Sequence, residues 1–197
     1  MLSRHQERAP LNLSLSFVTL LVVITVLLVL LMRTYNSLVR QRNTVRNGWS
    51  DIDVQLMRRH DLVPNLVESV RGYMTHERET LEAVTRARSQ AMTAGADLLT
   101  RATAEMALTG AVGNLFAVAE RYPTLKASNQ FLLLQEQISS TENRIAFARQ
   151  HYNESVRQYN TSLAEFPRNL IAGPLGFSPA SLFAADASDR TNVQVKV

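Results

Sequence analysis

The sequence predicts an all-α protein, in which an N-terminal transmembrane helix continues into an antiparallel four-helix bundle with long first and last helices. Three observations support this prediction. Residues 11–32 contain no charged side chain, and in the rest of the chain apolar residues recur at helical steps of three, four and seven. In addition, no segment alternates apolar and polar residues with the period of a β-strand.

The apolar run at residues 11–32 is long enough to cross a bilayer. At about 1.5 Å of rise per residue, a helix of this length spans the roughly 30 Å hydrocarbon core. A cleavable secretory signal is excluded, because the run is too long and residues 29–33 (VLLMR) offer no small-residue cleavage site. The alternative is a buried core helix, but the other helices are two-faced and this run is apolar all round. We therefore predict a single-pass anchor.

The charges that flank this run favour one orientation. Arg4 and Arg8 precede the run, whereas a longer series of arginines follows it, namely Arg33, Arg40, Arg42 and Arg46. The positive-inside rule then predicts an N-terminus outside and a body in the cytoplasm. We divide the chain into an N-terminal flank (1–10), the transmembrane helix (11–32), a helical bundle (33–166) and a Gly- and Pro-containing tail (167–197).

The first helix of the body is predicted over residues 35–74. Nothing between Met32 and Leu38 would break a helix, so the membrane helix is expected to run on into the body without interruption. Gly48 and Pro64 lie inside it, and each lowers its helix stability. Its apolar stripe consists of Leu38, Val45, Trp49, Ile52, Leu56, Val63, Leu66, Val70 and Met74.

Two shorter helices are predicted next. Residues 75–94 form the second helix, with Thr75, Glu77 and Glu79 favouring its start and Gly95 its end. Residues 96–122 form the third helix, which ends before Pro123. Its expected buried face consists of Leu98, Leu99, Leu108, Val112, Leu115, Phe116 and Ala119.

The last helix begins at Ser128 or Asn129 as cap and ends at Pro167. Its stripe consists of Phe131, Leu134, Ile138, Thr141, Ile145, Ala148, Tyr152, Val156, Tyr159, Leu163 and Phe166. In an up-down-up-down bundle this helix returns toward the bilayer, so Phe166 is expected near the membrane surface. The apolar residues at 170–183 would then reach the headgroup region or a neighbouring subunit.

Composition excludes several classes of function. The chain has no cysteine, so disulfides, thiol catalysis and thiolate metal sites are absent. The net charge is +4, and the basic residues are interspersed with acids, so no nucleic-acid partner is expected.

Catalytic and metal-binding motifs are incomplete. His76 and Glu77 begin like a zincin motif, but Thr80 stands where the second histidine ligand belongs. The remaining histidines lack partner spacing and are interpreted as solvated or interfacial, namely His5, His60 and His151. There is no phosphate-binding glycine loop and no serine nucleophile elbow. We therefore expect no enzyme activity, no metal and no cofactor.

A polar signature on the first helix of the body can pair with polar residues on the antiparallel last helix. The candidate residues are Arg58, Arg59, Asp61, Asn65 and Glu68, with Glu142, Asn143 and Arg144. Three interpretations are open. The residues could form a network that fixes helix register, a docking surface for a partner or another copy, or a ligand or ion site.

Five aromatic residues form a candidate interface. Tyr152 and Tyr159 lie seven residues apart on one helix face, either as core residues with their hydroxyls at its edge or as part of a subunit interface. The other members of the candidate interface are Trp49, Phe177 and Phe183.

Short motifs occur in order along residues 33–183. They are residues 35–39 (YNSLV), 42–43 (RN), 49–56 (WSDIDVQL), 58–67 (RRHDLVPNLV), 72–73 (GY), 119–127 (AERYPTLKA), 141–146 (TENRIA), 148–149 (AR), 152–153 (YN), 159–160 (YN), 166–169 (FPRN) and 176–177 (GF). Together these motifs resemble the LemA family. One departure is Gly48, which stands where that family commonly has alanine.

The resemblance implies a bacterial protein of the plasma (inner) membrane, with an N-terminal membrane helix, an α-helical bundle and no established catalytic activity. LemA-like proteins are often encoded beside a membrane protein that carries a TPM domain or beside a membrane metalloprotease. The resemblance therefore implies these two kinds of protein as partners.

These observations favour a non-enzymatic, membrane-anchored helical scaffold that self-associates and organises membrane partners. A rigid stalk leaves the bilayer, an apolar tail exceeds what a four-helix core needs, and anchoring in one membrane raises the effective concentration. One alternative is an adaptor or regulatory subunit of a membrane protease or transport system. Another is a small-ligand or lipid sensor, which would need a polar-lined cavity, whereas the predicted core stripes are almost wholly apolar.

Overall fold

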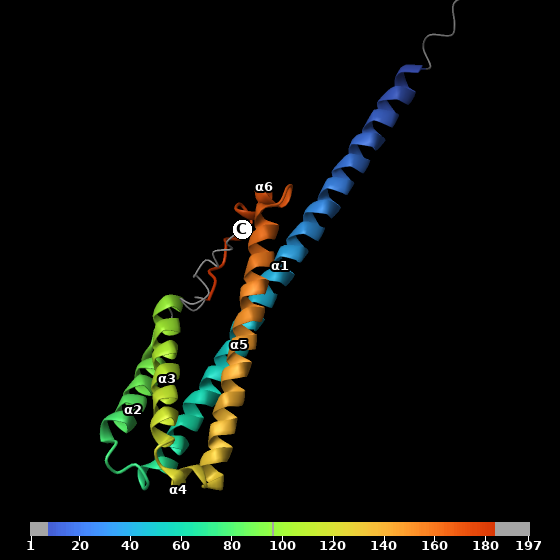
Figure 1. Ribbon diagram of the computed structural model, residues 1–197. Coiled ribbons are helices and arrows are strands. Elements are labelled where there is room, and N and C mark those ends of the chain that lie inside the picture. Colours follow the sequence, from blue (N-terminus) through green and yellow to red (C-terminus); the bar gives the residue numbers. More distant parts are fainter. Residues whose placement is uncertain (1–7, 96, 184–197) are drawn as a thin grey trace, which may run out of the picture. The chain divides into compact units, whose positions relative to one another are not determined.

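The computed structural model describes residues 8–95 and 97–183 of the chain, with side chains from residue 16 onward. Within these residues the regular structure is helical and contains no strand (Figure 1). The helices are α1 (Arg8–Arg71), α2 (Arg78–Thr93), α3 (Leu98–Ala119), α4 (Pro123–Lys126), α5 (Asn129–Ala164) and α6 (Arg168–Ala172). The prediction of an all-α chain with an apolar N-terminal helix is confirmed.

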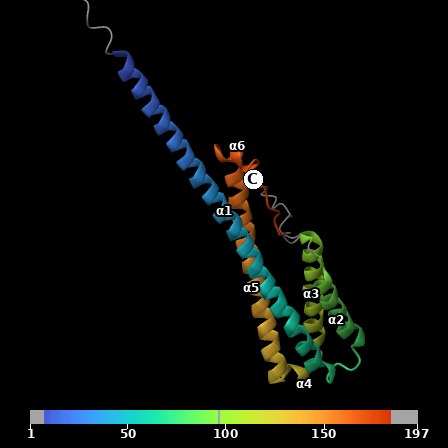
Figure 2. The same cartoon turned by 180° about the vertical axis from the view of Figure 1, so that it is seen from behind.

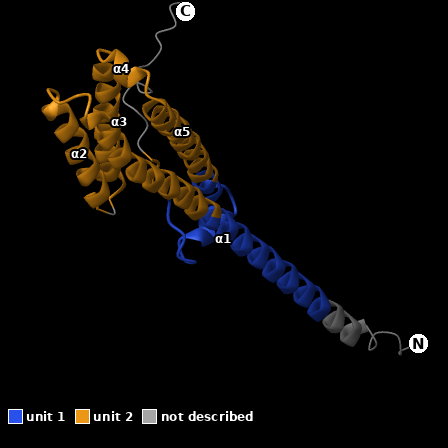
Figure 3. Cartoon of the chain, turned by 90° about the horizontal axis from the view of Figure 1, so that it is seen from below, with its two compact units in different colours: residues 1–43, 159–179 blue, residues 44–158, 180–197 orange. Residues whose placement is uncertain are grey.

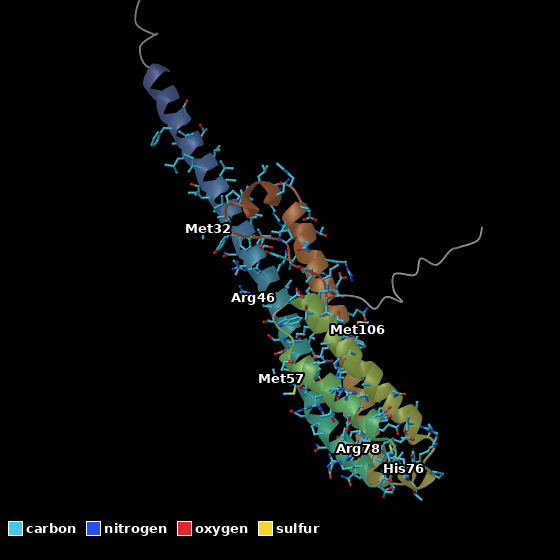
Figure 4. All side chains as sticks on the ribbon, turned by 90° about the vertical axis from the view of Figure 1, so that its left-hand side faces the viewer. Met32, Arg46, Met57, His76, Arg78 and Met106 are labelled. Carbon is cyan, nitrogen blue, oxygen red and sulfur yellow. The ribbon has the colours of Figure 1, made fainter. Side chains whose placement is uncertain are left out.

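The first helix, α1, is a single element of 64 residues that continues through Gly48 and Pro64. Every large apolar side chain at residues 17–32 is exposed, over 45% to 66% of its surface. Met32, labelled in Figure 4, ends this run, and Leu38 is the first fully buried side chain that follows it. Apolar side chains point outward on all sides of this segment, which suits the hydrocarbon interior of a membrane. There, a helix satisfies its own backbone hydrogen bonds.

Helix α3 is also long and apolar enough to cross a membrane by length and composition. It packs against α2, however, and the two helices lie side by side in Figures 1 and 2. Leu108 and Leu115 of α3 are fully buried, and so is the acidic residue Glu105 near the middle of the helix. We therefore treat α3 as a core helix.

The chain divides into two compact units (Figure 3). Unit 1 comprises residues 1–43 and 159–179, and unit 2 comprises residues 44–158 and 180–197. In unit 1, the buried apolar side chains are Leu38, Tyr159, Leu163, Ala172 and Phe177.

The core of unit 2 draws its side chains mainly from α1, α2, α3 and α5. Full burial of one Val, Leu or Phe side chain contributes about 1.5–3 kcal/mol, so this cluster holds the helices together. Its members are Val63, Leu66, Val67, Val70, Met74, Val84, Ala87, Ala91, Leu108, Val112, Leu115, Ala119, Leu125, Phe131, Leu134 and Ile138.

The connection between α1 and α2 differs from the prediction. α1 ends three residues before Met74, which packs into the core from the following turn. α2 begins at Arg78, with Glu77 as its N-cap residue but without a side-chain cap bond. The Glu77 carboxylate instead accepts hydrogen bonds from Arg121 Nη2 at 3.0 Å and from the Tyr122 hydroxyl at 3.2 Å. A long-range contact thus displaces the expected local cap.

Helix α3 begins with a cap that the sequence analysis missed. Asp97 accepts a hydrogen bond from the backbone N–H of Thr100 at 2.8 Å, which satisfies one of the exposed N–H groups of the first turn. The Thr100 hydroxyl donates to the same carboxylate at 2.6 Å. The bonds from this hydroxyl and from the backbone N–H hold the pKa of Asp97 below its ordinary value. The helix ends at Ala119 rather than at residue 122, and Pro123 then starts the short helix α4.

Two apolar residues that the periodicity placed on buried faces are exposed. Leu99, in the first turn of α3, is 64% exposed, and Phe166 is 79% exposed. α5 ends at Ala164, so Phe166 lies beyond the helix and no longer follows its stripe. The periodicity therefore predicted burial wrongly at the start of α3 and after the end of α5.

Gly48 lies where α1 and α5 approach each other closely. A Cβ atom at Gly48 would lie 3.3 Å from the Cα atom of Tyr152 and 3.6 Å from its Cβ atom. The first distance is shorter than an ordinary van der Waals contact. Glycine thus allows the two backbones to approach in unit 2 more closely than a larger residue would.

We expect Gly48→Val to lower the free energy of unfolding by about 1–3 kcal/mol, because its branched side chain meets the backbone of Tyr152. The measurement is urea unfolding of the detergent-solubilised chain, followed by helical circular dichroism. Gly110→Val in α3 is the matched control, since nothing lies within 4 Å of a Cβ atom there. Equal effects of the two substitutions would contradict a role for the close approach.

Candidate functional site

Arg59 of α1 lies at the centre of a buried charge network. Its side chain is fully buried, and its terminal nitrogens face acids from two other helices. Nη1 donates to Glu142 Oε1 of α5 and to Thr109 Oγ1 of α3, both at 2.6 Å. Nη2 donates to the Glu105 carboxylate of α3 and to the Glu105 carbonyl oxygen at 3.3 Å. One side chain therefore ties α1 to α3 and α5.

The Glu105 carboxylate is shared between Arg59 and a neighbouring histidine. Its Oε1 lies 3.0 Å from Nε2 of His60, and both side chains are buried. Arg88 of α2 donates from Nε to the His60 carbonyl oxygen at 2.7 Å, which brings a fourth helix to the site. We refer to Arg59, His60, Glu105, Thr109 and Glu142 as the Arg59 network.

Opposing effects set the ionisation of Glu105. Burial raises its pKa, because the charged form loses water, whereas the hydrogen bond from His60 and the positive charge of Arg59 lower it. The net result is a pKa below the ordinary value, so Glu105 is a carboxylate at neutral pH. A buried charge that lost its partner would be strongly destabilising. The Arg59 network therefore penalises any shift of α1 along α3 or α5.

The structure brings together part of the predicted polar set. Arg59 and Glu142 are joined directly. The other six residues are exposed, namely Arg58, Asp61, Asn65, Glu68, Asn143 and Arg144. His60, which was expected to be solvated or interfacial, is buried.

Sequence analysis missed Glu105 and Thr109. A signal was nevertheless present. Glu105 is the one acidic residue of α3 and lies within an apolar helix, where a charge requires a buried partner.

An aromatic cluster in unit 2 holds Phe183. The Phe183 ring lies 5.9 Å from the Trp49 ring of α1, and the Arg149 guanidinium of α5 lies 4.7 Å from the Phe183 ring centroid. Trp49 in turn meets the Tyr152 ring edge-on at 5.8 Å. Phe183 is 1% exposed, so these contacts remove its side chain from water.

Side chains of α5 also hold the backbone around Phe183. Asn153 Oδ1 accepts from the Phe183 N–H at 2.8 Å, and Asn153 Nδ2 donates to the Phe183 carbonyl oxygen at 3.2 Å. The Tyr152 hydroxyl donates to the Ser181 carbonyl oxygen at 2.8 Å. Burial raises the pKa of Tyr152, which keeps this hydroxyl protonated as a donor. We refer to Trp49, Arg149, Tyr152, Asn153 and Phe183 as the Phe183 clamp.

The two remaining residues of the predicted aromatic interface lie in unit 1. Tyr159 is 2% exposed and Phe177 is 6% exposed. The Phe177 ring meets Tyr35 edge-on at 5.7 Å, and the Arg42 guanidinium lies 5.0 Å from its centroid.

The expectation that the apolar tail exceeds what a four-helix core needs is wrong for Phe177 and Phe183. Phe177 and Phe183 are buried against helices of the same chain because α1 presents aromatic edges, Tyr35 and Trp49, that these rings cover. Exposed apolar residues of the tail are instead Leu170, Leu175 and Leu182.

An open groove lies on the surface of unit 2, between α3 and α5. It has a volume of about 540 Å³, and its apolar lining includes Val112, Phe116, Leu132 and Ile138. A hollow of about 450 Å³ on α5 shares Glu136, Ser139 and Asn143 with it and adds Arg144 and Phe147. We refer to the two together as the α3–α5 groove. Phe147 is 78% exposed there.

The contacts described above are hydrogen bonds, ion pairs and aromatic packing. In the part of the chain that the structure describes, no three or more His, Cys, Asp or Glu side chains gather in a way that could hold a metal ion. The charged side chains of the Arg59 network form ion pairs and hydrogen bonds with one another.

Comparison with known proteins gives a consistent result. The chain matches the LemA family over residues 48–197. It is similar to Protein LemA of Metamycoplasma hominis, with 28% identity over 158 residues that cover 80% of this chain and 72% of that protein. It is also similar to Magnetosome protein MamQ of Magnetospirillum gryphiswaldense, with 26% identity over 205 residues, 91% of this chain and 75% of that protein. Magnetosome protein MamQ 1 of Paramagnetospirillum magneticum is 27% identical over the same shares.

We expect Glu105→Gln to lower the free energy of unfolding by about 3–5 kcal/mol, because it removes one partner of a buried charge. The measurement is urea unfolding of the detergent-solubilised chain. Glu68→Gln is the control, since Glu68 and its partner Arg71 are exposed and such pairs contribute about 0–1 kcal/mol.

The same variant has a pH signature. The pKa of Glu105 is lower in the folded chain than its ordinary value of 4.5, so its contribution is present above that value and is lost as the pH falls through the folded pKa. The unfolding free energy of the wild type should therefore decline in acid more steeply than that of Glu105→Gln. An equal decline of the two unfolding free energies with falling pH would contradict a lowered pKa for Glu105.

We expect Phe183→Ala to lower the free energy of unfolding by about 3–5 kcal/mol, because it empties the Phe183 clamp. Phe166→Ala serves as the control in detergent, since Phe166 is 79% exposed and packs little against the protein. Thermal unfolding followed by near-ultraviolet circular dichroism reports on the Trp49 environment directly. An unchanged transition in Phe183→Ala would show that the tail is dispensable.

Proposed function

This chain belongs to the LemA family, and from that membership we propose that it is a non-enzymatic, membrane-anchored helical scaffold. In this role it associates with further copies of itself and organises other membrane proteins. The observation that carries the proposal is the α3–α5 groove, an apolar surface left open on a chain with a membrane-type helix.

Membrane attachment is supported by the continuity of α1. This helix carries the exposed apolar residues 17–32 and also supplies Val63, Leu66 and Val70 to the core of unit 2. Detaching the core from the anchor would therefore require breaking a helix.

The relatives are bacterial proteins, and we place this chain in a bacterial membrane as well. We assign it to the plasma membrane, with the N-terminus outside and the body in the cytoplasm. This orientation follows from the arginines that come after the apolar run.

A structural role is supported by the way the interior charges are used. Arg59 and Glu105 are fully buried and bonded to each other, so a substrate has no access to them. We propose that the Arg59 network fixes the register of an antiparallel four-helix bundle made of α1, α2, α3 and α5. The shared core and the contact from Arg88 support this arrangement.

A second copy is the occupant we propose for the α3–α5 groove. Leu132, which lines the groove, is 47% exposed, and covering apolar surface contributes about 25 cal/mol per Å². Copies anchored in one membrane share an orientation and a high effective concentration. A weak contact between grooves would therefore suffice to build a cluster.

One observation favours a second candidate function. Asn143 and Arg144 lie beside the exposed ring of Phe147, and aromatic and arginine side chains are enriched at protein–protein interfaces. This surface suits an adaptor or regulatory subunit of a membrane protease or transport system. A TPM-domain membrane protein and a membrane metalloprotease are the partners we propose for it.

Native electrophoresis of the solubilised chain tests the scaffold. We expect species larger than a monomer, and we expect Leu132→Glu to shift them toward the monomer because it places a charge in the groove. Met57→Glu on α1 is the matched control, since Met57 is 53% exposed outside the groove.

A strictly monomeric wild type would remove the scaffold proposal. In-cell crosslinking with mass spectrometry distinguishes the second candidate. A stoichiometric foreign partner that is lost in Arg144→Glu would favour the adaptor, whereas crosslinks between copies alone would favour the scaffold.

A further inference from the structure

Three large apolar side chains lie on the surface of unit 1 within ten residues of one another. Phe166 is 79% exposed, Leu170 is 64% exposed and Leu175 is 37% exposed. We refer to these residues, in and beside α6, as the α6 patch. Exposed apolar side chains that gather on a surface mark a binding site for something other than water, and these three lie close together along the chain.

The local fold presents this patch outward. Ala172 of α6 is 4% exposed and faces the protein, whereas Leu170, two residues earlier, points to another side of the helix. The Phe177 N–H donates to the Ala172 carbonyl oxygen at 3.0 Å, which closes the turn after α6. Arg168 Nη1 donates to Ser162 Oγ at 3.2 Å, which fastens the start of α6 to α5.

The turn after α6 is also fastened to the anchor helix. The Phe177 ring lies against Tyr35, and Arg42 lies over the same ring. Tyr35 comes three residues after Met32, which is about 4.5 Å along a helix. Tyrosine is enriched where transmembrane segments leave the hydrocarbon core. Within unit 1, this turn thus contacts α1 close to the end of its apolar run.

We propose that the α6 patch is a second membrane contact, in which Phe166, Leu170 and Leu175 insert between the headgroups and acyl chains of the bilayer that α1 spans. The lipid surface is the occupant because the patch belongs to the same unit as the span and is tied to α1 just beyond Met32. Arg33, directly after the apolar run, adds a cation at the level of the lipid phosphates.

The contact gives the anchor a property that a single helix lacks. One transmembrane helix can rotate about its own axis, whereas a helix with a second insertion on one side presents a fixed face to the membrane plane. The proposal requires that α1 spans the bilayer, but it is independent of self-association.

Site-specific fluorescence tests the proposal on the full chain. Because the chain has no cysteine, single cysteines at Phe166→Cys and Leu170→Cys can carry a solvent-sensitive nitrobenzoxadiazole label. The labelled chains are placed in phosphatidylcholine nanodiscs with or without spin-labelled lipid. Val26→Cys, inside the span, is the positive control, and Leu99→Cys is the control of matched exposure, since Leu99 and Leu170 are both 64% exposed.

We expect spin-labelled lipid to quench the labels at 166 and 170 several-fold more than the label at 99, with blue-shifted emission. Equal quenching at all three sites would overturn the proposal, and so would an unquenched label at 26. Quenching that needs added phosphatidylglycerol would also overturn it, because charge rather than apolar insertion would then hold the segment. Native electrophoresis of the same samples reports self-association separately.

Discussion

A guanidinium group that is wholly removed from water constrains how the helices of unit 2 can meet. Arg59 has no exposed surface, and its charge is balanced by Glu105 on α3 and Glu142 on α5. Apolar contacts have no preferred direction, so an interface made of apolar side chains alone tolerates more than one helix register. A fixed fork of donors does not, because displacement leaves a buried charge without a partner. The apolar core supplies most of the cohesion, and we propose that the Arg59 network supplies the register.

Much of the fold could be predicted from hydrophobic periodicity. The stripe of the first helix of the body reads directly from the sequence, and Ile52, Leu56 and Leu66 are fully buried as it requires. Periodicity was wrong at Phe166, which lies beyond the end of α5, because periodicity carries no information about where backbone hydrogen bonding stops. The missed boundary at α2 has a different cause, since Glu77 bonds to residues that are distant in the sequence.

The candidate site was predictable only in part, because its contacts also join residues that are distant in the sequence. Arg59 and Glu142 were predicted as site residues because they lie among other polar residues in the sequence. Most of those neighbours, however, face water. Glu105 stands alone in an apolar helix, and its partners come from α1, so no local pattern identifies them. Phe183 belongs to the tail, which was expected to exceed what a four-helix core needs. Its place in the core depends on Trp49 and Asn153, whose geometry exists only after α1 and α5 have packed.

The apolar residues of the tail fall into two groups, one buried by the protein and one exposed on its surface. Phe177 and Phe183 are buried by aromatic and cationic partners of their own chain, whereas Phe166 and Leu170 remain exposed. Exposed to water, these two side chains leave their apolar surface unburied. We propose that the bilayer covers these residues, because unit 1 also holds the apolar run of α1. On this proposal, the membrane is part of the folding environment and decides which apolar side chains of the tail the protein itself must bury.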